Sequence, residues 1–159
     1  MAISTRATGL KADVPAMAFI SLLMEIGKLR SPGIIFPQSL PSFFSRYKGD
    51  YVNGTKEGRG QFWWTSGTYA GDKYVGEFHA DRRHGRGHYF YANGEIFDGQ
   101  WNAGHQNGAG QILFANGNLL EGTWRNGKRE GEFTFTYLNG DKYSGRFRAG
   151  ERVGEWTRI

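Results

Sequence analysis

The sequence contains no cysteine, and this absence excludes several kinds of chemistry. Disulfide bonds, thiolate metal sites and cysteine nucleophiles are all ruled out, so packing alone must hold the fold together. A cytoplasmic location fits this composition. Leu, Ile and Val are scarce beside the aromatic residues, which comprise 5 Trp, 8 Tyr and 12 Phe in a chain of 159 residues. The apolar material of this protein is therefore mainly rings.

Long apolar runs are also missing. A helix that spans a membrane needs roughly 18 or more apolar residues, and the best segment, "VPAMAFISLLMEIGKL", is interrupted by Glu25 and Lys28. Its apolar residues recur at helical spacing, which predicts an amphipathic helix over about residues 14–30. A mitochondrial targeting role for residues 1–30 is the alternative, because residues 1–12 contain Ser, Thr, Arg and Lys and no acid.

Charge of one sign is not concentrated anywhere. The chain has 20 Lys plus Arg against 15 Asp plus Glu, and the blocks of like charge are short. The net charge of +5 favours anionic surfaces without requiring nucleic acid. The 25 glycines do not indicate disorder, because disordered segments lack aromatic residues.

The sequence does contain an internal repeat, with the pattern aromatic-x-Gly-x-aromatic. Another Gly follows eleven positions after the first residue of every copy. The last three intervals between copies are 23 residues, and the first is 27 because of extra residues in "TSGTYAGDK". Such a fixed period indicates a repeat architecture. The five copies are "YKGDY", "YVGEF", "FDGQW", "LEGTW" and "YSGRF", starting near residues 47, 74, 97, 120 and 143.

Each repeat is predicted to form two short strands. Large side chains alternate with polar ones in both halves, and this period of two is typical of a strand with one apolar face. Asn-Gly pairs such as Asn53-Gly54 and Asn93-Gly94 follow the strands and favour tight turns, and Asp81 takes the Gly position in the second copy. The Gly between two rings leaves a gap that a ring from the neighbouring strand can cover.

This pattern resembles the MORN repeat (membrane occupation and recognition nexus). The resemblance covers residues 47–159, with four full copies and a fifth that ends within its second strand. The chain departs from the pattern at Asp81, at Leu120 for the leading aromatic residue, and at Phe133 and Trp156 for the second Gly. The family resemblance implies a non-catalytic structural protein, and many similar proteins are components of the cytoskeleton or of the axoneme of cilia, including radial-spoke heads.

We therefore predict a mainly β fold: one elongated antiparallel sheet of consecutive β-hairpins, with a short N-terminal α-helix. A β-propeller is excluded because the repeats suffice for fewer than three blades. Residues 1–42 form an extension with the helix and a Pro-containing linker, and residues 43–159 form the array. The open ends of the sheet are predicted to be capped by the N-terminal extension or to pair end to end in a homodimer.

No catalytic residue, metal site or cofactor is predicted. The four histidines lie in strand or turn positions without a serine or carboxylate at the spacing of a triad. His84 and His88 would converge on a metal only in a helix, and this segment is turn and strand. Nucleic acid is not an expected partner, because the sheet accounts for the rings.

The leading hypothesis is a scaffold that binds other proteins of a larger assembly through a row of rings. These predicted partner-binding residues are Tyr51, Trp64, Phe78, Tyr91, Trp101, Phe114, Trp124, Tyr137 and Phe147.

The alternative is a peripheral membrane module that binds phosphoinositides through basic hairpin turns, because Lys and Arg near a membrane surface attract anionic lipids. Acidic residues such as Glu57 and Glu130 lie in the same turns, so a mixed, solvated edge is the simpler interpretation. The residues for lipid binding are Arg82, Arg83, Arg86, Lys128, Arg129 and Arg152.

Overall fold

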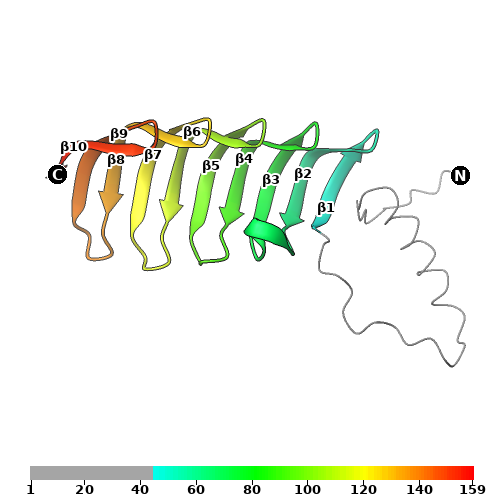
Figure 1. Cartoon of the computed structure of the whole chain (residues 1–159), viewed down its shortest axis with the longest axis horizontal. Coiled ribbons are helices and arrows are strands. Elements are labelled where there is room, and N and C mark those ends of the chain that lie inside the picture. Colours follow the sequence, from blue (N-terminus) through cyan, green and yellow to red (C-terminus); the bar gives the residue numbers. More distant parts are fainter. Residues whose placement is uncertain (1–44) are drawn as a thin grey trace, which may run out of the picture.

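The computed structural model describes residues 45–159, which form one open antiparallel sheet of ten strands in sequential order (Figure 1). The predicted mainly β array of hairpins is confirmed, whereas the predicted helix at 14–30 and its linker lie outside the described residues. The elements are β1 Arg46–Val52, β2 Thr55–Trp63, the 3-10 turn η1 Gly67–Tyr69, β3 Lys73–His79, β4 Arg82–Phe90, β5 Ile96–Asn102, β6 His105–Leu113, β7 Leu119–Arg125, β8 Lys128–Thr136, β9 Lys142–Arg148 and β10 Glu151–Arg158.

The fifth copy is longer than its sequence indicated. β10 has eight residues, against nine in each earlier second strand, and pairs with β9 at both ends. Arg158 stands where the earlier copies carry Phe62, Tyr89, Ile112 or Phe135. Backbone pairing needs no ring, and the strand continues to Arg158.

The two kinds of turn differ in backbone conformation. Turns after first strands have two residues, both with positive φ, as in Asn53 (49°) and Gly54 (79°). Ala80 and Asp81 adopt the same conformation, so Asp81 does replace a turn glycine. The turns after β4, β6 and β8 span five residues, such as 91–95, and only their Gly has positive φ, whereas the connection after β2 is longer. The rings predicted as the last strand residues, Trp64 among them, begin these longer turns.

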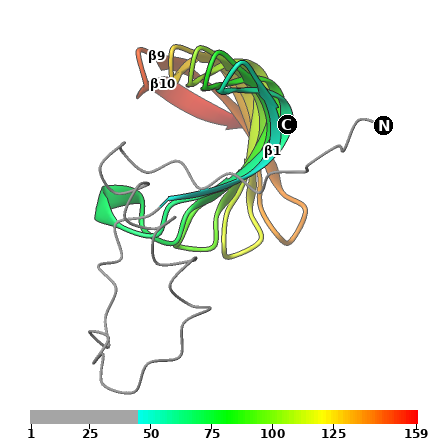
Figure 2. The ribbon, with the colours of Figure 1, turned by 90° about the vertical axis from the view of Figure 1, so that its right-hand side faces the viewer.

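The sheet bends into a gutter with a C-shaped cross-section (Figure 2). Rings four residues apart on one strand touch: the Tyr74 and Phe78 centroids lie 5.1 Å apart, and those of Phe97 and Trp101 lie 5.4 Å apart. A straight strand would separate such residues by roughly 13 Å. The strands therefore bend toward the rings, and the aromatic face is the concave one.

Glycine makes this bend possible. The Tyr74 ring lies over Gly76 of its own strand and Gly87 of the next, and a methyl group added at Gly76 would lie 2.5 Å from the Tyr74 hydroxyl oxygen. Phe97 covers Gly99 and Gly110 in the same way. In these copies the covering ring belongs to the same strand as the first Gly, not only to its neighbour as predicted.

Two departures from the repeat compensate each other. In the fourth copy Leu120 replaces the leading ring, and Phe133 replaces the second Gly on the neighbouring strand. The Phe133 ring lies over Gly122, its cross-strand partner, and fills the place that Tyr74 and Phe97 fill in their copies. Phe133 and Leu120 are both 2% exposed, so the exchange keeps the core filled.

The Gly at position eleven of each copy has a separate task. Gly58, Gly85, Gly108, Gly131 and Gly154 all have positive φ, and the strand register within each hairpin shifts at this level. This is the geometry of a β-bulge, which increases local bending and twist. Each hairpin therefore contributes its own bend to the gutter.

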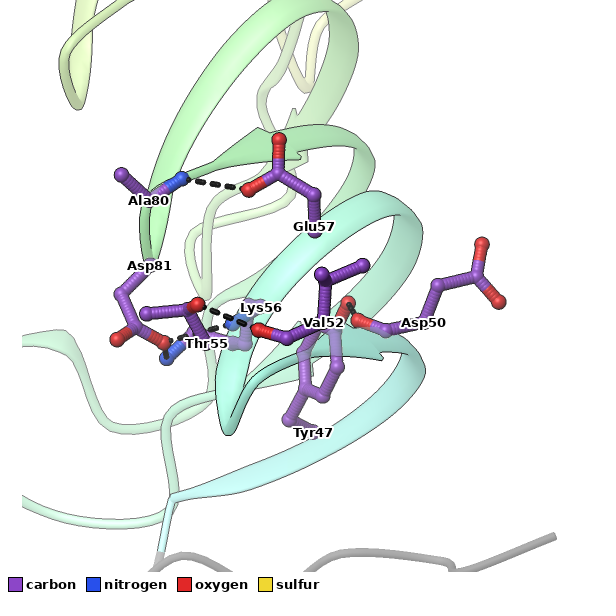
Figure 3. A network of polar contacts seen from close by, with 8 residues as sticks. All are labelled: Tyr47, Asp50, Val52, Thr55, Lys56, Glu57, Ala80 and Asp81. Atoms are coloured by element: carbon purple, nitrogen blue, oxygen red, sulfur yellow. Dashed lines mark hydrogen bonds and ion pairs between the residues drawn. The ribbon is translucent and has the colours of Figure 1, made fainter.

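The two-residue turns stack on one another along one edge of the sheet. The Glu57 carboxylate accepts a hydrogen bond from the Ala80 backbone N–H at 3.0 Å, and Asp81 pairs with Lys56 at 3.0 Å (Figure 3). The Glu130 carboxylate bonds the Ala149 N–H at 2.8 Å in the same manner. Acids that the sequence placed in a solvated edge thus join successive repeats.

Candidate functional site

The candidate site is the concave face, and its first ring row lies beside the two-residue turns. Phe78, Trp101, Trp124 and Phe147 are 3–7% exposed, because each ring packs between rings of adjacent repeats. Trp124, for example, makes edge contacts with Phe97 and Phe133 at 5.1 and 4.9 Å. Tyr51, at the β1 end, is half-buried. Most of the first row therefore forms the core of the single layer.

The second ring row lies along the opposite edge, where the five-residue turns begin, and is more accessible. Trp64, Tyr91 and Phe114 are half-buried, and Tyr137 is 45% exposed. Their backbones are held by turn hydrogen bonds, such as Phe114 N–H to Asn118 C=O at 2.9 Å. These four predicted partner-binding residues, with Tyr51 at the β1 end, have ring surface available to another molecule.

Between the two ring rows runs a line of hydrogen-bond donors that the sequence reasoning did not place there. The residue nine positions after the start of each copy pairs across the hairpin with a first-row ring. Arg83 pairs with Phe78, and Arg129 pairs with Trp124. Because paired residues share a face, the donor points into the gutter. The signal was present in the repeat, since this position is Lys56, Arg83, Gln106, Arg129 or Arg152.

Arg83 is surrounded by rings. Its guanidinium carbon lies 4.4 Å from the centroid of Trp101 and 5.2 Å from that of Tyr89, and it donates to the Gly104 carbonyl at 2.7 Å. Burial lowers the pKa of Arg83 and raises the pKa of Tyr89. The arginine stays charged in spite of this shift, because an unperturbed guanidinium titrates far above neutral pH.

The long insertion between β2 and β3 supports this cluster. It ends in Asp72, a carboxylate that is 7% exposed, and Asp72 accepts hydrogen bonds from the Tyr89 hydroxyl and from the Ala92 N–H (2.8 Å). Tyr89 therefore contacts both Asp72, through its hydroxyl, and Arg83, through its ring. The extra residues of the first copy are a structural support for the concave face as well as a longer loop.

The six residues assigned to lipid binding divide between two surfaces. Arg82, Arg86 and Lys128 are exposed. Arg83, Arg129 and Arg152 stack on rings of the concave face, with the last two 4.4 Å from Phe147 and 4.8 Å from Trp156, and of these three only Arg152 is also exposed. Alternation along the strand separates the two groups, so the basic residues do not form one edge.

Two hollows of the surface, one on each face, bear on the site. One, of about 440 Å³, lies in the concave face near β10, between aromatic residues and the Arg129 and Arg152 guanidiniums. The other, of about 500 Å³, lies on the convex face over β1–β4, where Lys48, Arg59 and Arg86 flank the glycine rows. The concave hollow is the one that contains accessible rings of the second row, Phe114 and Tyr137.

The histidines lie apart from the concave hollow. His79 Nδ1 is 2.6 Å from Glu57, and His88 Nδ1 is 3.4 Å from Asp98. Within residues 45–159 no three His, Asp or Glu side chains come together as metal ligands would. Nor does this part of the chain include a helix of the length and apolar character that crossing a membrane requires.

These features define a class of protein, a β-hairpin repeat array whose single sheet presents one aromatic concave face. A sequence model of the MORN repeat matches residues 47–69, 74–96, 97–119 and 121–142, more than half of the chain. The chain therefore belongs to the MORN-repeat family. No curated protein matches the sequence. Repeats of this family are consistent with a non-catalytic module that binds proteins or membranes.

Proposed function

We propose that this protein is a non-catalytic scaffold or adaptor that holds a segment of a partner protein in its concave face, within a cytoskeletal or axonemal assembly. The main support is the second ring row. It offers a line of partly exposed rings, with Tyr137 at 45% exposure beside a hollow of about 440 Å³. Exposed rings beside a hollow are typical of protein-interaction sites. The cytoskeletal and axonemal setting is an inference from family resemblance.

The test is a comparison of two double variants in the native cell type. Phe114→Ala with Tyr137→Ala removes two accessible rings of the concave face. Leu113→Ala with Leu138→Ala removes two exposed apolar side chains next to them in sequence and serves as the matched control. We expect cross-linked protein partners to be lost from the first variant alone, with both variants retaining the far-ultraviolet dichroism of the sheet. Equal recovery of partners by both variants would refute the proposal.

Membrane binding by the basic turns remains the alternative function, and the same variants separate it from the first. Flotation with phosphoinositide vesicles should respond to Arg82→Glu with Lys128→Glu, whose side chains are exposed, and not to the ring variants. If the charge reversal abolishes both flotation and partner recovery while the ring variants retain both, the lipid function replaces the scaffold function.

A further inference from the structure

The donor line of the concave face changes character between its two ends. Lys56 Nζ pairs with Asp81 at 3.0 Å, the Arg83 guanidinium donates to the Gly104 carbonyl at 2.7 Å, and Gln106 donates to the Tyr91 hydroxyl at 3.1 Å. Arg129 and Arg152 stack on Phe147 and Trp156, but their side chains have no hydrogen bond or ion pair to any residue of 45–159.

The repeat explains this difference. Each donor faces the second turn residue of the next copy, and for Lys56 that residue is Asp81, the acidic departure from the pattern. For Arg129 the corresponding residue is Gly150, whose N–H bonds the Arg129 backbone carbonyl and which has no side chain to offer. Arg152 lies in the last hairpin, so no later turn of residues 45–159 follows it. Within residues 45–159, the two arginines are thus cations without an acidic partner.

Their surroundings complete a site. Both guanidiniums line the hollow of about 440 Å³, together with Phe114, Phe135, Tyr137 and Trp156, and no acidic side chain of the described strands and turns lines it. A hollow that carries two cations and, among residues 45–159, no acidic side chain attracts an anionic group from outside.

We infer that this hollow is a carboxylate subsite for an acidic peptide segment of a partner protein, with an Asp or Glu of the partner on Arg129 and Arg152 and a neighbouring apolar side chain against the rings. The inference rests on the proposed scaffold function. Planar guanidiniums stacked on rings are suited to bidentate pairing with a carboxylate. A flat bilayer meets the exposed turn residues instead, because Arg129 lies inside the concave face.

The test begins with a random dodecapeptide library displayed on phage and selected on the full chain. We expect selected peptides to carry Asp or Glu beside Phe, Trp or Leu. A selected peptide and its analogue with Gln in place of Glu are then compared by fluorescence anisotropy. The acidic peptide should bind the wild-type protein roughly tenfold more tightly than the analogue, as expected for the loss of a charged hydrogen-bonded pair.

Two pairs of variants identify the subsite. Arg129→Gln should bring the ratio of the two Kd values close to one, whereas Arg125→Gln, the same charge loss on an exposed convex side chain, should preserve it. Gly150→Asp should also bring the ratio close to one, by giving Arg129 the internal acid that Lys56 has in Asp81. Gly127→Asp adds the same charge at the equivalent turn position beside Gln106 and should leave the ratio unchanged.

The outcomes separate the two proposals. Peptides that bind through Phe114 and Tyr137 with no preference for acid would overturn the subsite and leave the scaffold function standing. No selected peptide at all would overturn both. The subsite is also overturned if phosphoinositide vesicles float in a manner that requires Arg129, or if peptides bind only after deletion of residues 1–44, which would make the chain's own N-terminal segment the occupant.

Discussion

At the scale of the residue, the exchange between Leu120 and Phe133 shows how the repeat tolerates departures. In both hairpins one ring lies over the glycine of the first strand. The ring comes from the first strand in the case of Phe97 and from the second strand in the case of Phe133. The two positions are therefore coupled, and substitutions at one should depend on the residue at the other.

A double-mutant cycle tests this coupling. Phe133→Gly should lower the free energy of unfolding by about 3–5 kcal/mol because it empties the place over Gly122. Leu120→Phe alone should lower it by about 1–3 kcal/mol through overpacking. The double variant restores the pattern of the second and third copies, so urea denaturation should show less destabilisation than the sum. Strict additivity would mean that the two side chains do not share one space.

Residue-scale electrostatics are clearest at Glu57. The hydrogen bond from the Ala80 N–H, with that from His79, holds the pKa of this carboxyl below its usual range. The stabilisation it contributes is present above the ordinary carboxyl pKa and is lost as pH falls through the lowered folded value. The contribution belongs to the charge, because a neutral amide could still accept the Ala80 hydrogen bond.

Glu57→Gln should accordingly melt at a lower temperature than the wild type at neutral pH, and the two melting temperatures should converge in acid. Glu155→Gln is the matched control, because its exposed carboxylate has no hydrogen bond within the described part of the chain. The difference in melting temperature should disappear below the pKa values of Glu57 in the folded and in the unfolded chain. A difference that persists unchanged there would show that the charge of Glu57 is not its cause.

At the scale of the element, turn chemistry is the point on which sequence reasoning worked best. Positive φ at Asn53, Gly54 and Asp81 follows from local preferences that a short stretch of sequence reveals. Ala80, Ala103 and Ala149 adopt the same conformation with φ values of 47–52°, although alanine disfavours it. Pairing of the flanking strands imposes that conformation, which is why no local signal identified it.

Ala149→Asn should therefore raise the free energy of unfolding by about 0.5–1 kcal/mol, because Asn is more stable than Ala in the left-handed region. Ala115→Asn, in a five-residue turn where φ is negative, should change it by less than about 0.5 kcal/mol. Thermal or urea denaturation measures both. Equal effects at the two positions would attribute the gain to something other than the turn conformation.

At the scale of the whole molecule, each hairpin pairs only with its neighbours in the chain. The stability of such an array approximates a sum over repeats and their interfaces, so a whole repeat can be removed without a change of fold. β1 and β10 are the two ends of this order, and end-to-end homodimerisation through them stays a prediction.

Deletion of residues 97–119 should leave a folded, less stable sheet, with β4 pairing directly with the strand that begins near Leu120. Its long dimension in small-angle X-ray scattering should shorten by about 10 Å, the width of two strands. Deletion of β5 and its turn alone, residues 96–104, removes a single strand. Every later strand would then run in the opposite direction relative to β4, so this shortened protein should not fold. A folded product from that second deletion would show that antiparallel order is not required.

Alternation and turn preference act over a few residues, so the amino-acid sequence specifies the number of hairpins, the Asn-Gly turns and the side of the sheet on which the rings lie. Tertiary structure decided which rings are buried and which stay accessible, since this depends on packing between copies and on the bend at each bulge. It also turned Arg83, Arg129 and Arg152 into the concave face, because cross-strand register sets the direction of a side chain.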